Sequence, residues 1–270
     1  MSRRVPSLSL DTLPGVGLEE INDRAGLQTR VDTKYLIAPA THAHLLSALA
    51  QRPEWACLAI DGQRHFRYGS TYFDTPSLLT YHQHRQGRRR RFKIRTRAYL
   101  DTGDCSFEVK LRGARESTVK RRMSYAMDDA DRLTARAQEF VAEVLDAAYG
   151  VEVPEHLAAR ARTEYRRHTL IDRAAGTRVT CDTALVCSSG DRRVAAGPMV
   201  VVETKATKPG NPVDRLMRSL GAHPIRLSKY CVATAVLNPD VPANPWARVL
   251  REWFGPTAAT PAVWRVPEAA

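Results

Sequence analysis

Charged and apolar side chains alternate along several short segments of this chain, and no other feature constrains its fold as strongly. In KIRTR (93–97), the basic residues occupy every second position, and FEVKL (107–111) and VVETKA (201–206) alternate in the same way. Successive residues of a β-strand point to opposite faces. Each segment therefore predicts a strand with one apolar and one charged face. RVDTKYL (30–36) and RVTCD (178–182) show the same alternation.

An acidic residue stands two positions before a lysine in three of these strands. The pairs are Asp32/Lys34, Glu108/Lys110 and Glu203/Lys205. Two arrangements fit the pattern. The charged faces could be solvated, with the core built from the opposite faces and from helices. Alternatively, the strands could close into a barrel with the charges inside, where about eight strands enclose room for one small ligand. Buried cations need compensation, which a phosphate chain with a divalent metal would supply.

The order of elements predicts an α+β fold. Strands are expected over 28–37, between 66 and 125, and over 163–171, 177–187 and 198–206. Helices are expected from Pro39 to about 51, over 129–149 with Asp128 or Asp129 as cap and Gly150 at the end, between Asn211 and Gly221, and from Ser228. Tyr72 and Asp74 fit a turn at a strand end. In the tail, residues 246–254 place apolar side chains on one helical face, which predicts a packed helix, with a membrane-surface or partner helix as the alternative.

We expect three regions: an irregular N-terminal segment over 1–27, one main domain over 28–238, and a proline-containing tail over 239–270 with a short amphipathic helix. No segment has the apolar length of a transmembrane helix, and the N-terminus lacks the apolar region of a signal peptide. The five cysteines are odd in number and form no CxxC pair. They predict reduced thiols in a cytoplasmic protein.

The net charge of +12 and a pI of about 9.8 favour polyanionic partners. Composition alone leaves nucleic acid, an anionic membrane and a phosphate compound open. The run GRRRRFK (87–93) could be an RNA-binding patch. A reader of single strands interleaves aromatic and basic residues, and only Phe92 and Tyr99 are near, so no nucleic acid is expected. Because His82, His84 and His168 lack partners at metal-ligand spacing, we expect them not to be ligands.

In their order and spacing, several motifs resemble the VTC (vacuolar transporter chaperone) domain, a polyphosphate-polymerase-like branch of the triphosphate tunnel metalloenzymes. The resemblance covers roughly 28–238 and rests on RVDTKYL, STYFDT, RRRRFKIRTR, FEVK, TEYRRH, RVTCD, VETK and RLSKY. The related CYTH enzymes open with ExExK, but Arg30 here stands at the first acidic position and Asp32 at the second. This departure disfavours a simple CYTH-type triphosphatase and matches the more basic VTC branch.

The resemblance implies an eight-stranded antiparallel β-barrel, the triphosphate tunnel, with flanking helices. It also implies phosphate contacts from Lys34, Arg95, Arg97, Lys110, Arg167, Arg178, Lys205 and Lys229. Six of these, Lys34, Arg95, Arg97, Arg167, Lys205 and Lys229, would also act in catalysis. Arg167 is preferred over Arg166 because it shares a strand face with Tyr165. Independently, Ser228 as a helix cap would put Lys229 at a helix N-terminus, which favours anions.

By the same resemblance, Glu203 would hold Mn²⁺ or Mg²⁺ with Glu108 as a helper, since hard oxygen ligands suit these ions. Asp182 could join the site or pair with an inner arginine. The implied activity is a polyphosphate polymerase-like phosphotransferase that moves the γ-phosphoryl group of ATP to a polyphosphate chain. Hydrolysis of triphosphate or nucleoside triphosphate, and polyphosphate binding without catalysis, remain the alternatives.

Overall fold

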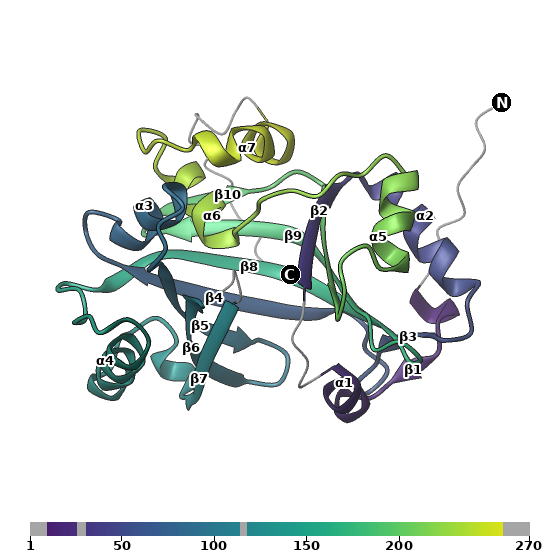
Figure 1. The fold of residues 1–270 in the computed structure, drawn as a ribbon, viewed down its shortest axis with the longest axis horizontal. Helices are drawn as coiled ribbons and strands as arrows, with labels where there is room; N and C mark the ends of the chain where they lie inside the picture. Colours follow the sequence, from purple (N-terminus) through teal and green to yellow (C-terminus); the bar gives the residue numbers. More distant parts are fainter. Residues whose placement is uncertain (1–9, 26–30, 114–117, 256–270) are drawn as a thin grey trace, which may run out of the picture. The chain divides into compact units, whose positions relative to one another are not determined.

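The computed structural model describes residues 10–25, 31–113 and 118–255 (Figure 1). Its strands are β1 (Gly15–Val16), β2 (Val31–Ile37), β3 (Trp55–Leu58), β4 (Phe66–Asp74), β5 (Phe92–Tyr99), β6 (Asp104–Arg112), β7 (Thr118–Tyr125), β8 (Ala158–Asp172), β9 (Arg178–Ser189), β10 (Arg192–Ala195) and β11 (Val200–Ala206). Its helices are α1 (Leu18–Ala25), α2 (Pro39–Ala50), α3 (Leu79–Arg85), α4 (Ala135–Tyr149), α5 (Pro212–Ser219), α6 (Lys229–Leu237) and α7 (Ala247–Phe254).

The strands form one sheet whose main path is β2-β11-β9-β8-β4-β5-β6-β7. The β11–β2, β11–β9, β4–β5, β5–β6 and β6–β7 pairs are antiparallel, and the short β1 pairs with β3 in parallel. The predicted α+β class with an eight-strand antiparallel path is confirmed. Residues 28–30, which belong to the first predicted strand, lie outside the described residues.

The chain divides into two compact units, each assembled from three segments. The first unit contains Met1–Phe66, Arg166–Ala184 and Pro198–Arg226, and the second contains Arg67–Tyr165, Leu185–Gly197 and Leu227–Ala270. Strands β8 and β9 contribute residues to both units. The single domain expected over 28–238 stays a prediction.

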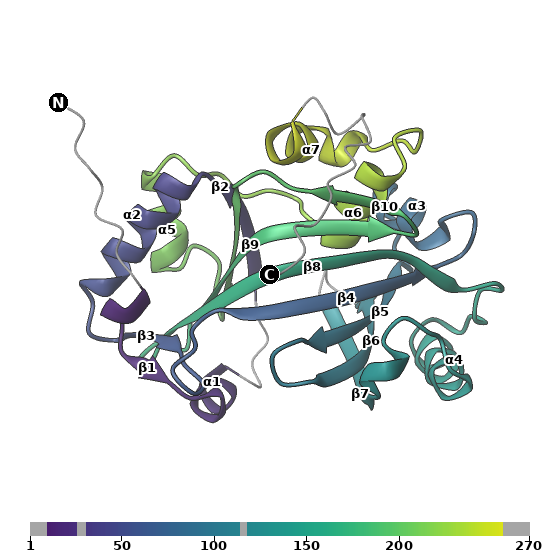
Figure 2. The same cartoon turned by 180° about the vertical axis from the view of Figure 1, so that it is seen from behind.

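The first unit packs α2 and α5 on the apolar faces of its strands (Figures 1 and 2). Leu45 and Leu49 of α2 and Met217 of α5 share a core cluster with Tyr35 of β2 and Val202 of β11. Tyr35 and Val202 alternate with charged neighbours along their strands, so burying the apolar face turns the charged face of each strand away from this core.

The second unit repeats this principle with α4. Val141 and Leu145 of α4 share a core cluster with Ile94 of β5 and with Phe107 and Val109 of β6 (Figure 1). Along β5, buried and half-buried residues alternate strictly, and the half-buried ones include the basic residues. The alternation seen in the sequence thus separates a core face from a charged face in both units.

Several caps lie where the sequence places them. The Asn211 side chain accepts hydrogen bonds from the N–H groups of Val213 and Asp214, and that of Ser228 accepts one from Cys231. Helix α4 differs: Thr134, not Asp128 or Asp129, caps it, because the two aspartates lie in a 3-10 turn. Gly150 ends the helix with φ of 60°, as expected.

The N-terminal segment expected to be irregular contains β1 and α1. Backbone pairing with β3 orders β1, a long-range contact that local sequence does not reveal. In the tail, α7 buries Val249, Trp253 and Phe254 and packs near α6, as the packed-helix prediction requires. No helix within the described residues is long and apolar enough to span a membrane.

Candidate functional site

The β2–β11 cluster contains two lysines and two carboxylates: Asp32, Lys34, Glu203 and Lys205. The antiparallel register sets Glu203 opposite Lys34, and Lys205 opposite Asp32. Glu203 Oε1 accepts hydrogen bonds from Lys34 Nζ at 3.0 Å and from Lys205 Nζ at 2.6 Å. Lys205 Nζ also lies 3.2 Å from Asp32 Oδ2. Lys34 and Lys205, two predicted phosphate contacts, therefore both bind Glu203, the predicted metal ligand.

Electrostatics keep Lys34 charged within this cluster. Burial opposes the ammonium form, but the Glu203 carboxylate and, more weakly, Asp32 outweigh burial, so the pKa of Lys34 is raised above its ordinary value. A phosphate oxygen in place of Glu203 would likewise favour the charged ammonium form of Lys34.

The next strand of the path, β9, places Arg178 directly opposite Lys205. Farther along β9, Asp182 binds Arg167 of β8 through two hydrogen bonds, Nε to Oδ1 at 2.6 Å and Nη2 to Oδ2 at 2.8 Å. Asp182 is 2% exposed and the Arg167 side chain 11%. Of the two roles left open for Asp182, the structure shows the ion pair with an inner arginine.

The β5–β7 cluster surrounds Glu108 with cations and consists of Lys93, Arg95, Arg97, Glu108, Lys110 and Lys120. Glu108 Oε2 accepts a hydrogen bond from Arg95 Nε at 2.8 Å, and Oε1 lies 3.3 Å from Lys120 Nζ. Burial alone would raise the pKa of Glu108, but Arg95, Arg97 and Lys120 reverse that effect and hold the pKa well below its usual range. Glu108 is therefore a buried carboxylate that stays ionised.

A row of three lysines crosses this cluster in register. Lys93 of β5 is opposite Lys110 of β6, and Lys110 is opposite Lys120 of β7. Like charges directly opposite one another destabilise a sheet. The adjoining row, Arg95–Glu108–Arg122, supplies one carboxylate for two arginines. The cluster thus carries an excess of positive charge that an anion would relieve.

Two further predicted cations of the second unit each lie close to an aromatic ring. The guanidinium carbon of Arg97 lies 5.8 Å from the centre of the Tyr68 ring, and Lys229 Nζ lies 4.4 Å from that of Tyr165. Lys229 is the first residue of α6, directly after the Ser228 cap. The predicted position of Lys229 at a helix N-terminus is confirmed.

Lys120 was not among the residues predicted from sequence, because the strand 118–125 has basic residues at both alternating positions and so shows no single charged face. Asp74 was predicted to lie in a turn, which the structure supports: this fully buried carboxylate accepts hydrogen bonds from the N–H groups of Thr75, Thr80 and Tyr81. The hydroxyl of Tyr230, the residue after Lys229, also donates to Asp74. The Asp-Pro spacing signalled the turn, but not the contact with Tyr230.

The carboxylates differ in how well they suit a divalent metal. Both oxygens of Glu108 are engaged by cations. Glu203 also contacts two cations, Lys34 and Lys205. Glu203 and Asp32, however, both contact the Lys205 ammonium, so their oxygens converge on one position. Mg²⁺ is commonly held by one or two carboxylates together with substrate phosphates and water. The pair Glu203 and Asp32 fits that pattern; Arg30, the residue at the first position of the ExExK comparison, lies outside the described residues.

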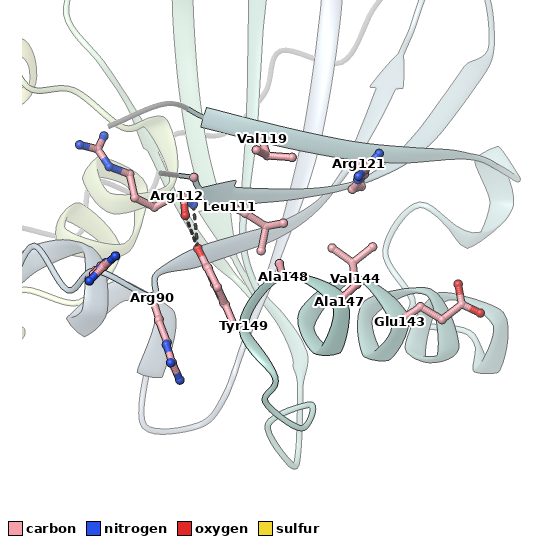
Figure 3. Close-up of a pocket in the computed structure, with 12 residues that line it drawn as sticks. Arg90, Leu111, Arg112, Val119, Arg121, Glu143, Val144, Ala147, Ala148 and Tyr149 are labelled. Carbon is pink, nitrogen blue, oxygen red and sulfur yellow. Dashed lines mark hydrogen bonds between the residues drawn. The ribbon is translucent and has the colours of Figure 1, made fainter. Parts of the chain in front are cut away.

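The hollow drawn in Figure 3 is a different feature. It lies between α4 and the ends of β6 and β7, where Arg112, Arg121 and Tyr149 line it. The Tyr149 hydroxyl donates to the Arg112 carbonyl at 2.9 Å and accepts from its N–H at 2.8 Å. All ten predicted site residues lie in the described part of the chain, and this hollow is lined by none of them.

Comparison with known proteins decides the family. The family model described as the VTC domain matches residues 29–238. The chain belongs to the VTC domain family. All ten predicted phosphate and metal residues of this VTC domain, from Lys34 to Lys229, fall inside the match. A search of curated proteins finds no match to the chain.

Two solved structures show a distant likeness to this VTC domain. One, from Hippeastrum, is a candidate adenylyl cyclase described as having a dominant triphosphatase activity; it is 14% identical, with 76% of this chain and 95% of that chain covered and a TM-score of 0.48. The other, a candidate adenylate cyclase from Bacillus halodurans, is also 14% identical, with 75% and 95% covered and a TM-score of 0.49.

Proposed function

We propose that this VTC domain is a metal-dependent phosphotransferase of the polyphosphate polymerase type, with ATP as donor and a polyphosphate chain as acceptor. The observation that carries the proposal is the in-register row Lys93–Lys110–Lys120, which adjoins the buried carboxylate Glu108. Such a row is unfavourable in an empty protein and favourable around a polyanion. Family membership adds support from an independent source.

The proposed phosphate contacts are those predicted from sequence. Arg95 and Arg97 of β5 have the planar fork that binds two phosphate oxygens at once. Lys34 and Lys205 would exchange part of their contact with Glu203 for phosphate oxygens. Arg167, Arg178, Lys110 and Lys229 complete the set.

In the proposed reaction, a terminal oxygen of the polyphosphate chain attacks the γ-phosphorus of ATP. The new P–O bond lengthens the chain by one phosphate, and the bond from the γ-phosphorus to the β–γ bridging oxygen breaks to release ADP. The attacking oxygen is already anionic, so this step requires positioning and charge neutralisation and no general base. Lysine and arginine side chains supply both.

A divalent metal would be held by Glu203 and Asp32, and Mn²⁺ and Mg²⁺ suit these oxygens. When bound, the metal supplies positive charge to the phosphate oxygens of the donor. Lys205 lies 2.6 Å from Glu203 and 3.2 Å from Asp32, so its single charge offsets part of the negative charge of this pair. We assign Glu108 a different role, which is to position Arg95 through their hydrogen bonds.

Hydrolysis is the second candidate, and Asp32 favours it. This exposed carboxylate lies beside Lys205 and could accept a proton from a water molecule that attacks phosphorus. Polymerase and hydrolase differ only in the acceptor, so the same contacts with the donor serve both.

The deciding experiment is product analysis. Purified protein is incubated with γ-labelled ATP and Mn²⁺, and the products are resolved by gel. We expect the label in long chains together with ADP. Label in free phosphate alone would establish the hydrolase instead. Intact ATP together with tight polyphosphate binding would identify a binding module and overturn the catalytic proposal.

A further inference from the structure

Two histidines and a cysteine that are remote in sequence meet in the first unit, although sequence spacing gave one of them, His168, no metal-ligand partner. His42 comes from α2, His168 from β8 and Cys181 from β9, and one ligand atom from each lies within 4.8 Å of the others. The Nε2 atoms of His42 and His168 are 3.1 Å apart. A third ring, that of His65, stands edge-on to His168 with 5.2 Å between the ring centres.

This group occupies the apolar side of the sheet. His168 follows Arg167 on β8, and Cys181 precedes Asp182 on β9. Because side chains alternate along a strand, His168 and Cys181 leave the face opposite to the Arg167–Asp182 pair. Cys181 belongs to the core cluster that α2 covers with Leu45 and Leu49. The group is therefore separate from the proposed phosphate contacts.

Polar rings are unfavourable in such a place without strong partners. His168 is 1% exposed, and its Nδ1 has no hydrogen-bond partner among the described residues. The contact with His42 satisfies one nitrogen of each ring at most. Most buried polar atoms in proteins have a partner, and an exception calls for an explanation such as an ion.

The residue types suit a metal. A neutral imidazole offers the lone pair of one ring nitrogen, and a cysteine binds a metal as the thiolate. Metal binding would therefore release the proton of the Cys181 thiol.

We propose that His42, His168 and Cys181 form a binding site for Zn²⁺, distinct from the oxygen-ligand site at Glu203 and Asp32. Two imidazole nitrogens and one thiolate are ligands that Zn²⁺ takes in tetrahedral sites, with a fourth position left for water or another group. His42 is half-buried, so the ion can enter from the side of α2. Bound Zn²⁺ would tie α2 to the adjacent strands β8 and β9.

The test uses Co²⁺, which reports its ligands by absorption. Tag-free, metal-depleted protein is titrated with Co²⁺ and then with Zn²⁺. We expect a thiolate-to-cobalt charge-transfer band that saturates near one equivalent, together with visible bands of tetrahedral intensity, and loss of both on adding Zn²⁺. Co²⁺ bound only by Glu203 and Asp32 gives no thiolate band, so the two sites are distinguished.

Matched variants assign the ligands. Cys181→Ser should abolish the charge-transfer band, and His42→Gln should weaken Co²⁺ binding at least tenfold. Cys187→Ser, at another buried cysteine of β9, and His44→Gln, at the exposed histidine of the same helix α2, should behave as wild type. Circular dichroism checks the fold of each variant. His42→Gln changes a half-buried side chain, so it keeps the test decisive if Cys181→Ser does not fold.

Two results would overturn the proposal. Absence of the charge-transfer band in wild-type protein would leave a histidine–histidine hydrogen bond in the core and no metal site. An unchanged band in a folded Cys181→Ser protein would place the thiolate ligand elsewhere. A rise in melting temperature with Zn²⁺ that His42→Gln abolishes and His44→Gln retains would support the site independently.

Discussion

Arg167 binds Asp182 with its forked guanidinium, Nε to Oδ1 at 2.6 Å and Nη2 to Oδ2 at 2.8 Å, across the neighbouring strands β8 and β9. In this pair, a residue predicted to contact phosphate binds a carboxylate that is 2% exposed. The pair should therefore affect both the stability of the fold and the binding of phosphate, and an experiment can separate these two effects.

Asp182→Asn should lower the free energy of unfolding, since removing one partner of a buried ion pair typically costs about 3–5 kcal/mol. Triphosphate should restore part of the loss, because it gives Arg167 a new anionic partner. Chemical denaturation with and without triphosphate, at matched ionic strength, measures both effects. Asp191→Asn, at an exposed residue in the turn after β9, is the control. Equal stabilisation of wild type and Asp182→Asn by triphosphate would argue that Arg167 does not contact phosphate.

Glu203→Gln keeps the shape of the side chain and removes its charge. We expect turnover to fall by at least about a hundredfold, as for loss of a metal-binding or other strong electrostatic contact. Phosphate binding should persist or tighten, because Lys34 and Lys205 lose the carboxylate that competes for them. Kinetics and calorimetry on the same preparation test this. Glu139→Gln, at an exposed residue of α4, is the matched control, and unchanged turnover in Glu203→Gln would remove Glu203 from the mechanism.

Arg95 and Arg97 should respond differently to substitution by alanine. Each loss should weaken triphosphate binding about tenfold or more, since charge-assisted hydrogen bonds contribute roughly 1.5–3 kcal/mol. Only Arg95→Ala should also destabilise the fold, because it deprives the buried Glu108 of its closest cation. Lysine should restore binding in part, as it lacks the fork. Thermal unfolding and binding measured side by side check the contrast; wild-type affinity in both variants would place this strand face outside the site.

Lys110→Gln should have effects of opposite sign on the empty and the loaded protein. Lys110 is the middle member of the row Lys93–Lys110–Lys120, so neutralising it reduces repulsion in the empty protein and should leave stability equal or higher. It should also weaken polyphosphate binding. Melting temperatures over a polyphosphate titration show both. Lys208→Gln, at an exposed residue after β11, is the control, and a Lys110→Gln protein with unchanged polyphosphate affinity would contradict the role proposed for the row.

His84 should make the second unit acid-sensitive. Burial, with a smaller effect from Lys93, lowers its pKa to about 3, although the Thr80 carbonyl contact at 2.8 Å favours the proton; Arg91 and Lys110 oppose it. The unfolded chain takes up this proton near pH 6.5. The free energy of unfolding should therefore fall as pH drops from about 6.5 towards 3, by at most about 1.4 kcal/mol per pH unit. Denaturation at several pH values should show a smaller fall in His84→Gln and an unchanged one in His223→Gln, at an exposed residue. Identical pH profiles for His84→Gln and wild type would exclude His84 as the cause.

Much of the fold follows from local sequence. Alternation identified the strands that carry Lys34, Arg95, Glu108 and Lys205, because the two faces of a strand are set by its backbone geometry. Asn211, Ser228 and Gly150 marked helix ends for an equally local reason, the need of terminal backbone groups for partners or of the chain for a positive φ. At the start of α4 the local prediction was wrong, because Thr134 caps the helix where Asp128 or Asp129 was expected.

Elements that depend on partners remote in the chain could not be predicted from local sequence. The two-residue β1 exists through pairing with β3, and α3 follows a turn in which Asp74 gathers backbone N–H groups and the distant Tyr230. Neither has a periodic pattern of its own, since both are held by contacts that close long loops in the chain.

The sequence by itself therefore determined the composition of the charged faces, the family motifs and most helix caps. Only the tertiary structure decided which side chains contact one another. Lys34 and Lys205 both contact Glu203, Lys120 contacts Glu108, and His42 lies close to His168 and Cys181. The physical reason is range. The strand face on which a side chain lies and the residue that caps a helix are fixed by a few neighbouring residues. Strand order and helix packing are set by burial of the whole core, and they bring residues 42, 168 and 181 together.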